Sequence, residues 1–396
     1  MIRCLGCMAL GGAAFLAAQN MPRVPRSTDQ RVAAIEARLK EAPTDSVLRN
    51  DLAGAYLQKM RETADGNYLE RASQIVGAVL KSDPTNYDAR RRQLEIEMQR
   101  HHFRQVIELA PSMLEQRPKD VAVWGMLGDA GMETGDYDRA ADAYQTMVDL
   151  RPDLASYNRV AFYRFVTGDA DGAIEIMRRA VCSGASEPEN VAWCLADLGR
   201  MLLKTGAYDE AEQAFRQALA RFPGYHAALA GLGRVYAARA QYSEAIQQLL
   251  SAQAKAPFPE YAGLLAKLYR KTGKTDLEQR QIALLDVADR LDRAAGETAN
   301  RNLSLALSDL GLRPERALEL AQAELKVRQD VYTYDALAWA LFHNGKLEEA
   351  EAAIRRALSQ NSPEPSFHEH AAQIFESRGR IEEMRLHRSK ARSDYW

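Results

Sequence analysis

Residues 334–358, YDALAWALFHNGKLEEAEAAIRRAL, carry the side chains most suggestive of chemistry in this sequence. Asp335, Trp339, Phe342 and His343 lie on a short apolar run beside a cluster of acidic residues. A carboxylate, an indole and an imidazole brought together could begin a catalytic or ligand-binding site. The same stretch could instead be one unit of a scaffold whose large side chains are simply buried. The choice depends on the elements that surround it.

Other candidate motifs give little support to catalysis or metal binding. His368 and His370 form an H-x-H, and His101 and His102 are adjacent. Residues two apart on a helix point away from each other, so we expect no shared metal ion. The sequence contains no Gly-rich phosphate loop, no G-x-S-x-G and no H-E-x-x-H. We therefore expect neither a metal nor a cofactor.

The four cysteines are ambiguous. Cys4 and Cys7 form a C-x-x-C inside an apolar leader, without the βαβ context of a redox motif. Cys182 and Cys194 flank the segment SGASEPEN. In an exported protein they could form a disulfide across that loop, whereas isolated buried thiols are the alternative.

The composition is that of a folded, helical and nearly neutral chain. Its 52 Lys and Arg residues against 54 Asp and Glu residues leave a formal charge of −2. The chain is therefore not basic overall, and its charge gives no reason to expect nucleic acid as a partner. Alanine is abundant and β-branched runs of strand length are few, which favours helix.

Internal repetition dominates the sequence. Leu198, Gly199, Ala211 and Pro223 are each followed 34 positions later by the same residue type. Three segments align with one another in phase: 123–152, 195–223 and 228–257. Weaker units extend this array in both directions, so no separate catalytic domain has room to exist.

The repeat resembles the tetratricopeptide repeat, whose unit follows W-x2-L-G-x2-Y…A-x3-F…P. The matching residues of the first segment are Trp124, Leu127, Gly128, Ala140, Tyr144 and Pro152. The resemblance implies an all-α fold, a right-handed superhelical solenoid of antiparallel helix pairs. In each pair small residues allow the helices to approach closely, and large ones fill the remaining volume. In residues 334–358 the pattern assigns these residues to packing: Leu337, Ala338, Leu341, Ala350, Ile354 and Ala357.

Glycines at the turn between the two helices form a further prediction. Gly135, Gly206 and Gly345 stand where a helix end favours a positive φ. Pro152 and Pro223 are expected to end the second helix of their units.

We divide the chain into four parts on these patterns. They are residues 1–26, a signal or anchor segment and linker; 27–86, divergent N-terminal helices; 87–259, the central tetratricopeptide array; and 260–396, a C-terminal tetratricopeptide-like array.

The N-terminal segment predicts export or tethering. One arginine precedes an apolar run over residues 4–18, which is followed by a Pro-punctuated link. This run is short for a membrane span but suits the core of a secretory signal. We expect an exported or membrane-tethered protein, periplasmic or secreted, and a cytoplasmic protein is the alternative.

The order of features also resembles a group of bacterial tetratricopeptide proteins whose biochemical role is not established. The resemblance covers residues 120–396, and its most specific part is DALAWAL followed by a helix with HA-x-x-I. It implies a bacterial solenoid, many relatives of which carry export signals, and it transfers no activity.

The family resemblance also locates a candidate binding surface. The first helix of each unit lines the concave face, where partner peptides bind in the family. The residues projected onto that face are Trp193, Arg200, Lys204, Arg234, Tyr261, Tyr332, Asp335, Trp339, Phe342 and His343. Aromatic and Arg side chains are typical of binding hot spots. For Trp193, Trp339 and Phe342, packing between units is the alternative.

These observations predict a scaffold and not an enzyme. We expect the concave groove to bind a protein or peptide partner without catalysis. Two alternatives remain open. One is a subunit of a bacterial envelope assembly, and the other is a small-ligand binder or enzyme with a site near Asp335 and His343.

Overall fold

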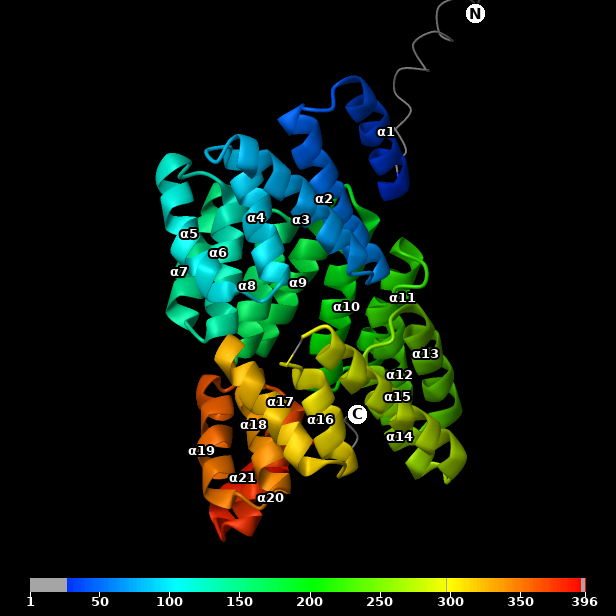
Figure 1. Cartoon of the computed structure of the whole chain (residues 1–396). Helices are drawn as coiled ribbons and strands as arrows, with labels where there is room; N and C mark the ends of the chain where they lie inside the picture. Colours follow the sequence, from blue (N-terminus) through cyan, green and yellow to red (C-terminus); the bar gives the residue numbers. More distant parts are fainter. Residues whose placement is uncertain (1–26, 297, 393–395) are drawn as a thin grey trace, which may run out of the picture.

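The structure is a computed structural model that describes residues 27–296, 298–392 and 396. These residues form 21 α-helices and one short 3-10 turn, and none of them forms a strand (Figure 1). The helices are α1 (Thr28–Glu41), α2 (Ser46–Thr63), α3 (Asn67–Ser82), α4 (Tyr87–Gln99), α5 (Phe103–Gln116), α6 (Val121–Thr134), α7 (Tyr137–Leu150), α8 (Leu154–Val166), α9 (Ala170–Ser183), α10 (Pro188–Thr205), α11 (Tyr208–Arg221), α12 (His226–Ala238), α13 (Tyr242–Lys255), α14 (Pro259–Lys271), α15 (Thr275–Ala294), α16 (Arg301–Leu310), α17 (Pro314–Val327), α18 (Val331–His343), α19 (Leu347–Ala357), α20 (Pro365–Ser377) and α21 (Ile381–Lys390), with η1 (Leu358–Gln360).

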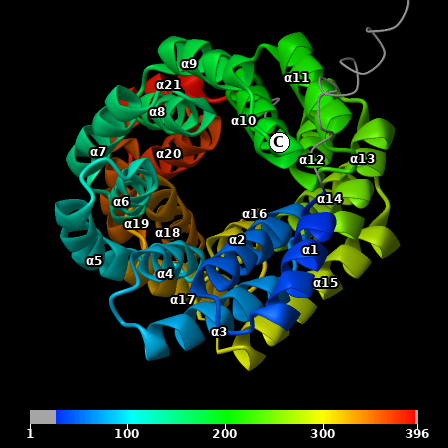
Figure 2. The same ribbon diagram turned by 90° about the horizontal axis from the view of Figure 1, so that it is seen from above.

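After α1 the helices pack as antiparallel pairs, from α2 with α3 to α20 with α21. The pairs follow one another around a ring seen from above in Figure 2. The first helices of the pairs, such as α8, α10 and α12, form the inner layer, and their partners α9, α11 and α13 form the outer layer. The predicted all-α solenoid is confirmed.

Glycines in the first helices allow the two layers to approach closely, as the repeat predicts. Phe215 of α11 is fully buried between two such glycines. A Cβ atom at Gly199 or Gly231 would lie 2.6 or 2.2 Å from its ring. A Cβ atom at Gly128 would lie 2.4 Å from the ring of Tyr144. Any side chain at these positions would therefore push the outer helix away.

The predicted turn glycines adopt the left-handed conformation. Gly135, Gly206 and Gly345 have φ values of 74°, 90° and 71°. Gly135 and Gly206 directly follow a first helix, and Gly345 is the second residue after one. Such a φ is accessible to glycine at little cost, so each of these first helices ends in a tight turn.

The superhelix overlaps itself, because helices far apart in the sequence are in contact. The amide of Val331 donates to the hydroxyl of Tyr137 at 3.0 Å, across 194 residues of sequence. One residue pair nearby, Arg328 and Glu133, forms an ion pair of 2.9 Å. Helices α17 and α18 therefore lie against the α6–α7 turn, below the first part of the chain in Figure 1.

The N-terminal helices contact the start of α10. Arg31 of α1 forms an ion pair of 2.5 Å with Glu187, the residue before α10. The amide of Gln58 donates to the buried carboxylate of Glu189 at 3.2 Å. Burial raises the pKa of Glu189. These contacts span 156 and 131 residues of sequence. Long-range polar contacts therefore hold the N-terminal helices α1 and α2 against the start of α10.

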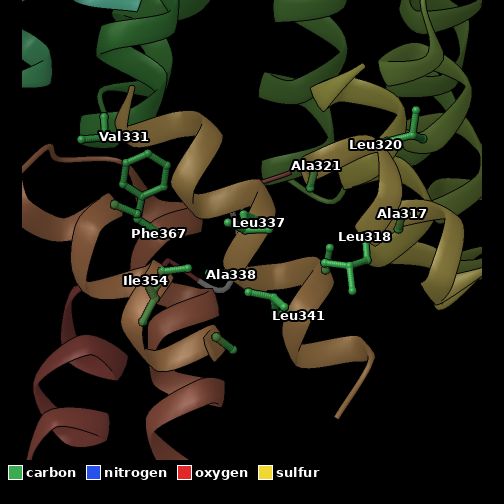
Figure 3. Close-up of a cluster of buried hydrophobic side chains, with 14 of the residues drawn as sticks. Ala317, Leu318, Leu320, Ala321, Val331, Leu337, Ala338, Leu341, Ile354 and Phe367 are labelled. Carbon is green, nitrogen blue, oxygen red and sulfur yellow. The ribbon is translucent and has the colours of Figure 1, made fainter. Parts of the chain in front are cut away.

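The C-terminal pairs share one large apolar core. Figure 3 shows side chains of α17, α18, α19 and α20 converging there. All six packing residues predicted within 334–358 are buried: Leu337, Ala338, Leu341, Ala350, Ile354 and Ala357. Phe367 of α20 and Val331 of α18 extend the same core. Residues 334–358 are therefore a helix pair of the scaffold.

Cys182 and Cys194 do not form a disulfide. Cys182 is exposed, and Cys194 is buried next to the side chain of Asn158, whose nitrogen is 3.6 Å from its sulfur. Burial raises the pKa of the Cys194 thiol to about 12. The alternative of isolated thiols holds for both residues, although only Cys194 is buried.

Two expectations concern the N-terminal segment. The leader and the C-x-x-C lie outside the described residues. Among the helices that the structure describes, none is both long and apolar enough to cross a membrane.

Candidate functional site

A cavity of about 630 Å³ opens on the inner face of the superhelix. Its lining comes from the first helices of six consecutive pairs, α10, α12, α14, α16, α18 and α20, and from Arg392 and Trp396 after α21. None of the second helices that the structure describes contributes a residue to this lining. The concave position predicted for a binding surface is therefore where the cavity lies.

Cations and carboxylates alternate along the cavity wall and pair with each other. Lys204 forms an ion pair of 2.5 Å with Glu364, and Lys267 forms one of 3.0 Å with Asp309. A third pair of 2.5 Å joins Arg234 to Glu260. The wall thus offers both signs of charge at close spacing. Such a wall suits a ligand with mixed polar groups better than a polyanion.

Trp339 forms the aromatic centre of the wall. Its ring stacks on the imidazole of His370 with the centroids 4.2 Å apart and an interplanar angle of 12°. Its indole nitrogen donates to Asp309 at 3.0 Å. Phe342 stacks on the indole with a centroid distance of 5.1 Å. Only 6% of Trp339 is exposed, so it serves mainly as a rigid support for its neighbours.

A buried histidine–aspartate pair lies beside this indole. Nδ1 of His370 is 2.8 Å from Oδ1 of Asp335, and both side chains are buried. Burial alone would lower the pKa of His370, but the Asp335 carboxylate outweighs it and raises the pKa. Burial also raises the pKa of Asp335, against the opposing effect of His370. The opposite charges of the two side chains therefore stabilise each other in a buried site where either charge alone would be destabilised.

The cavity brings together five of the ten predicted residues: Lys204, Arg234, Tyr332, Asp335 and Trp339. Tyr332 lies at the edge of Phe367, with the ring centroids 5.3 Å apart. Each of Lys204 and Arg301 places a charged nitrogen group within about 6 Å of the Tyr332 ring.

The other five predicted residues do not line the cavity. Trp193 and Arg200 are exposed on α10, and Arg200 pairs with Asp197. Tyr261 is buried, with its hydroxyl 2.8 Å from Nδ1 of His226. Tyr261 is therefore a packing residue and not a surface residue.

Phe342 and His343 pack against the indole of Trp339 instead of facing the cavity. The centroid of the His343 ring is 4.5 Å from that of Trp339. For Phe342 the packing alternative is the one that the structure supports. A site combining Asp335 with His343 does not form, because Asp335 pairs with His370.

Several residues of the cavity were missed by the sequence reasoning, namely Lys267, Arg301, Glu364, Phe367, His370, Arg392 and Trp396. The repeat period could have identified His370. Asp335 and His370 are 35 residues apart, as are His226 and Tyr261, and both pairs join equivalent positions of adjacent first helices. A residue one repeat away is therefore the first partner to consider in this fold.

The H-x-H histidines have separate partners. His370 faces Asp335, whereas Nδ1 of His368 is 2.9 Å from Nδ1 of His387 on α21. Among the described residues no group of three or more His, Cys, Asp or Glu side chains could hold a metal ion.

The His368–His387 contact predicts an acid-sensitive C-terminal helix. Burial and His387 lower the pKa of His368 to about 4, and burial also lowers the pKa of His387. Because the unfolded side chains titrate near 6.5, protonation favours the unfolded state as the pH falls from about 6.5 toward 4. Hydrogen exchange of α21, corrected for intrinsic rates, should be faster at pH 5 than at pH 7.5.

The His387→Gln variant should lose much of this pH dependence, and the exposed Arg385→Gln control should keep it. Equal pH dependence in the His387→Gln and wild-type proteins would refute the prediction.

The fold and the cavity together define a helical repeat solenoid with a cavity on its concave inner face. Sequence models described as tetratricopeptide repeat match residues 100–155, 152–224, 202–268, 302–365 and 336–383. Together they cover more than half of the chain. The chain belongs to the tetratricopeptide repeat family, and proteins of this family are in general protein-interaction scaffolds.

A solved structure shows the same fold at low sequence identity, and others are similar to this chain with lower TM-scores. A monomeric mutant of IFIT1 with Gppp-AAAA is 14% identical over 82% of this chain and 75% of that chain, with a TM-score of 0.51. The Cut9-Hcn1 hetero-tetramer of the APC/C is 14% identical over 88% of this chain, with a TM-score of 0.49. The present chain spans 60% of that chain's length. The PilF protein of Pseudomonas aeruginosa is 19% identical over 53% of this chain and 92% of that chain, with a TM-score of 0.39. Comparison with curated protein sequences finds no match.

Proposed function

We propose that this protein is a non-catalytic scaffold that binds an extended segment of a protein partner in the inner cavity. The observation that carries the proposal is the composition of the cavity wall. Six first helices contribute to it, and they bring Lys204, Arg234 and Tyr332 to one surface. An extended peptide presents amides, charged groups and apolar side chains, which such a mixed wall can match.

The enzyme alternative has less support than the scaffold. It was based on Asp335 and His343, but the Asp335 carboxylate is engaged by His370 and His343 packs against Trp339. The envelope-assembly alternative concerns the identity of the partner and is compatible with the same cavity.

Filling the cavity tests the proposal without dismantling its wall. Asn302 is exposed and Gln373 is half-buried, and both line the cavity. The Asn302→Trp and Gln373→Trp substitutions together should occupy the space that a partner needs. A matched control carries Gln105→Trp and Gln247→Trp, on exposed positions of the second helices α5 and α13.

Affinity capture from the native host should then separate the two variants. We expect at least a tenfold loss of captured partner for the cavity variant, and capture at the wild-type level for the control. Both proteins should keep the wild-type circular dichroism. A folded cavity variant that retains every partner would show that binding occurs elsewhere.

We further propose that residues 1–26 direct export or tether the protein to a membrane, as their apolar run suggests. N-terminal sequencing of the mature protein after cell fractionation tests this. A cleaved protein in the periplasm or medium, or an uncleaved one in the membrane fraction, would support it. An intact N-terminus on cytoplasmic protein would contradict it.

A further inference from the structure

Helix α15 carries apolar side chains on the face that it turns away from the superhelix. Leu284, Val287 and Leu291 are 44%, 38% and 64% exposed. The helix belongs to the outer layer, outside α14 (Figure 2). None of its described residues lines the inner cavity. With 20 residues it is longer than any other helix that the structure describes. This surface is therefore separate from the proposed partner site.

The opposite face of α15 holds the helix in the fold. Leu285 is fully buried in the apolar core shared with the C-terminal pairs. Nε of Arg270 in α14 donates to Glu278 at 2.7 Å, and Arg316 in α17 forms an ion pair of 2.8 Å with Asp289. Residues 278, 285 and 289 are seven and four positions apart, so they lie on one side of the helix. Packing against α14 and α17 therefore does not use the exposed apolar residues.

The other outer helices show that this fold does not require an apolar outer face. Helices α3, α5, α7, α9, α11, α17 and α19 have no large apolar side chain among their exposed residues. Helix α13 has only Leu250, and α21 has Ile381 and Leu386. Single exposed apolar residues are common on protein surfaces, whereas an aligned set marks an interaction surface. The three aligned residues of α15 therefore need an explanation other than the fold.

The spacing of these residues is that by which two helices pack. Leu284, Val287 and Leu291 are three and four positions apart, as are positions a, d and a of a heptad. Ala294 is exposed and continues the stripe at the next d position. A second helix along α15 would cover this stripe over about three turns. The geometry therefore suits a helix as the occupant.

The charged side chains beside this stripe are arginines. Arg280 lies one turn before Leu284, and Arg290 is adjacent to Leu291. Both are exposed, and neither forms an ion pair with another residue that the structure describes. The acidic residues from position 281 to 296 contact other side chains, in the pairs Asp286–Arg313, Asp289–Arg316 and Asp292–Asn300. The outer face is therefore positively charged and complements an acidic partner.

We propose that the outer face of α15 binds an amphipathic helix of another protein, whose apolar stripe covers Leu284, Val287 and Leu291 and whose acidic residues pair with Arg280 and Arg290. This inference goes beyond the proposed function, because it assigns a second binding surface on the outside of the superhelix. Docking through apolar residues three and four positions apart is a recurring mode of helix recognition. Two separate surfaces would let the scaffold hold two partners together.

A second copy of this chain is a poorer occupant than an acidic helix. Two α15 helices packed antiparallel around Val287 would place Arg280 and Arg290 of both chains along one seam. The acidic residues between these arginines already contact Arg313 and Arg316. The seam would therefore bring like charges together without a counter-charge, which is destabilising.

Two synthetic peptides test the chemistry of this surface. Each has three heptads with leucine at a and d, and one carries glutamate and the other lysine at e and g. Fluorescence anisotropy of the labelled peptides measures binding to the full chain and to the Leu284→Ala/Leu291→Ala and Arg280→Glu/Arg290→Glu variants. The matched control is Ile381→Ala/Leu386→Ala, which shortens two exposed apolar side chains of the outer helix α21.

The wild type should bind the glutamate peptide at least tenfold more tightly than the lysine peptide. The leucine variant should bind the glutamate peptide at least tenfold more weakly, and the control should bind it like the wild type. The arginine variant should prefer the lysine peptide. All the substitutions are at exposed positions, so each protein should keep the wild-type circular dichroism. No binding of the glutamate peptide, equal binding of both peptides, or binding unchanged in the leucine variant would overturn the inference.

Two further measurements address the other occupants. Sedimentation should give the same mass for the wild type and the leucine variant, and a wild-type dimer that dissociates in the variant would assign the surface to a second copy. Flotation with vesicles of phosphatidylglycerol and phosphatidylcholine should not depend on the two leucines. Flotation of the wild type that is lost in the leucine variant would assign the surface to a membrane. Either result would overturn the helix proposal.

Discussion

Phe215→Ala is expected to lower the free energy of unfolding of the central helix pairs by about 3 to 5 kcal/mol. Phe215 is fully buried and fits against two glycines, one on each neighbouring first helix. Glycine backbones are held in their helices and cannot move into the space, so the substitution leaves a cavity. The loss should exceed that at a site lined by flexible side chains.

Phe162→Ala is the matched control, because Phe162 is 38% exposed on α8. Its effect should be below about 1 kcal/mol, since little apolar surface is returned to water. Urea unfolding gives the midpoints, and hydrogen exchange identifies which pairs are affected, as repeat arrays need not unfold in one step. Faster exchange in α10–α12 is expected for Phe215→Ala. Similar losses from both substitutions would mean that Phe215 is not the packing centre of these pairs.

His370→Leu is expected to cost about 3 to 5 kcal/mol, because it leaves the buried Asp335 carboxylate without its partner. The side chains of His370 and Asp335 are only 8% and 3% exposed. Replacing both groups, in Asp335→Val/His370→Leu, should restore most of the stability, since no charge then remains to be buried. Recovery in the double variant distinguishes a charge effect from a packing effect.

The pH dependence of the His370→Leu defect has a predicted sign. Burial raises the pKa of Asp335, and removal of His370 removes the opposing effect. A carboxyl group with a raised pKa in the folded state is tolerated when protonated and loses stability as the pH rises. The difference in melting temperature from the wild type should therefore be smaller at pH 5 than at pH 8. A difference that is the same at both pH values, with no recovery in the double variant, would contradict the ion-pair interpretation.

The repeat was predictable from sequence because its local rules are strict. Small residues such as Gly128 and Gly199 must face an aromatic residue on the paired helix, and Gly206 must take a positive φ. These requirements act within about one repeat, so a 34-residue comparison finds them. The packing roles within 334–358 follow from the same comparison.

The cavity was predictable only in part. First helices face inward in every pair, which identified Lys204, Arg234 and Tyr332. The comparison did not show which inward residues converge, because that depends on contacts such as Tyr137 with Val331, 194 residues apart. The repeat comparison also could not place Arg392 and Trp396 in the cavity lining, because both residues follow the last helix and have no counterpart in the repeat.

Site-specific photocrosslinking tests most directly whether the partner lies in the cavity. A benzophenone side chain placed at Gln373 points the probe into the cavity, and one at Gln247 places it on the outer layer. Irradiation in the native host should give a partner adduct from position 373 and none from position 247. An adduct from position 247 alone, or equal adducts from both positions, would contradict binding in the concave groove.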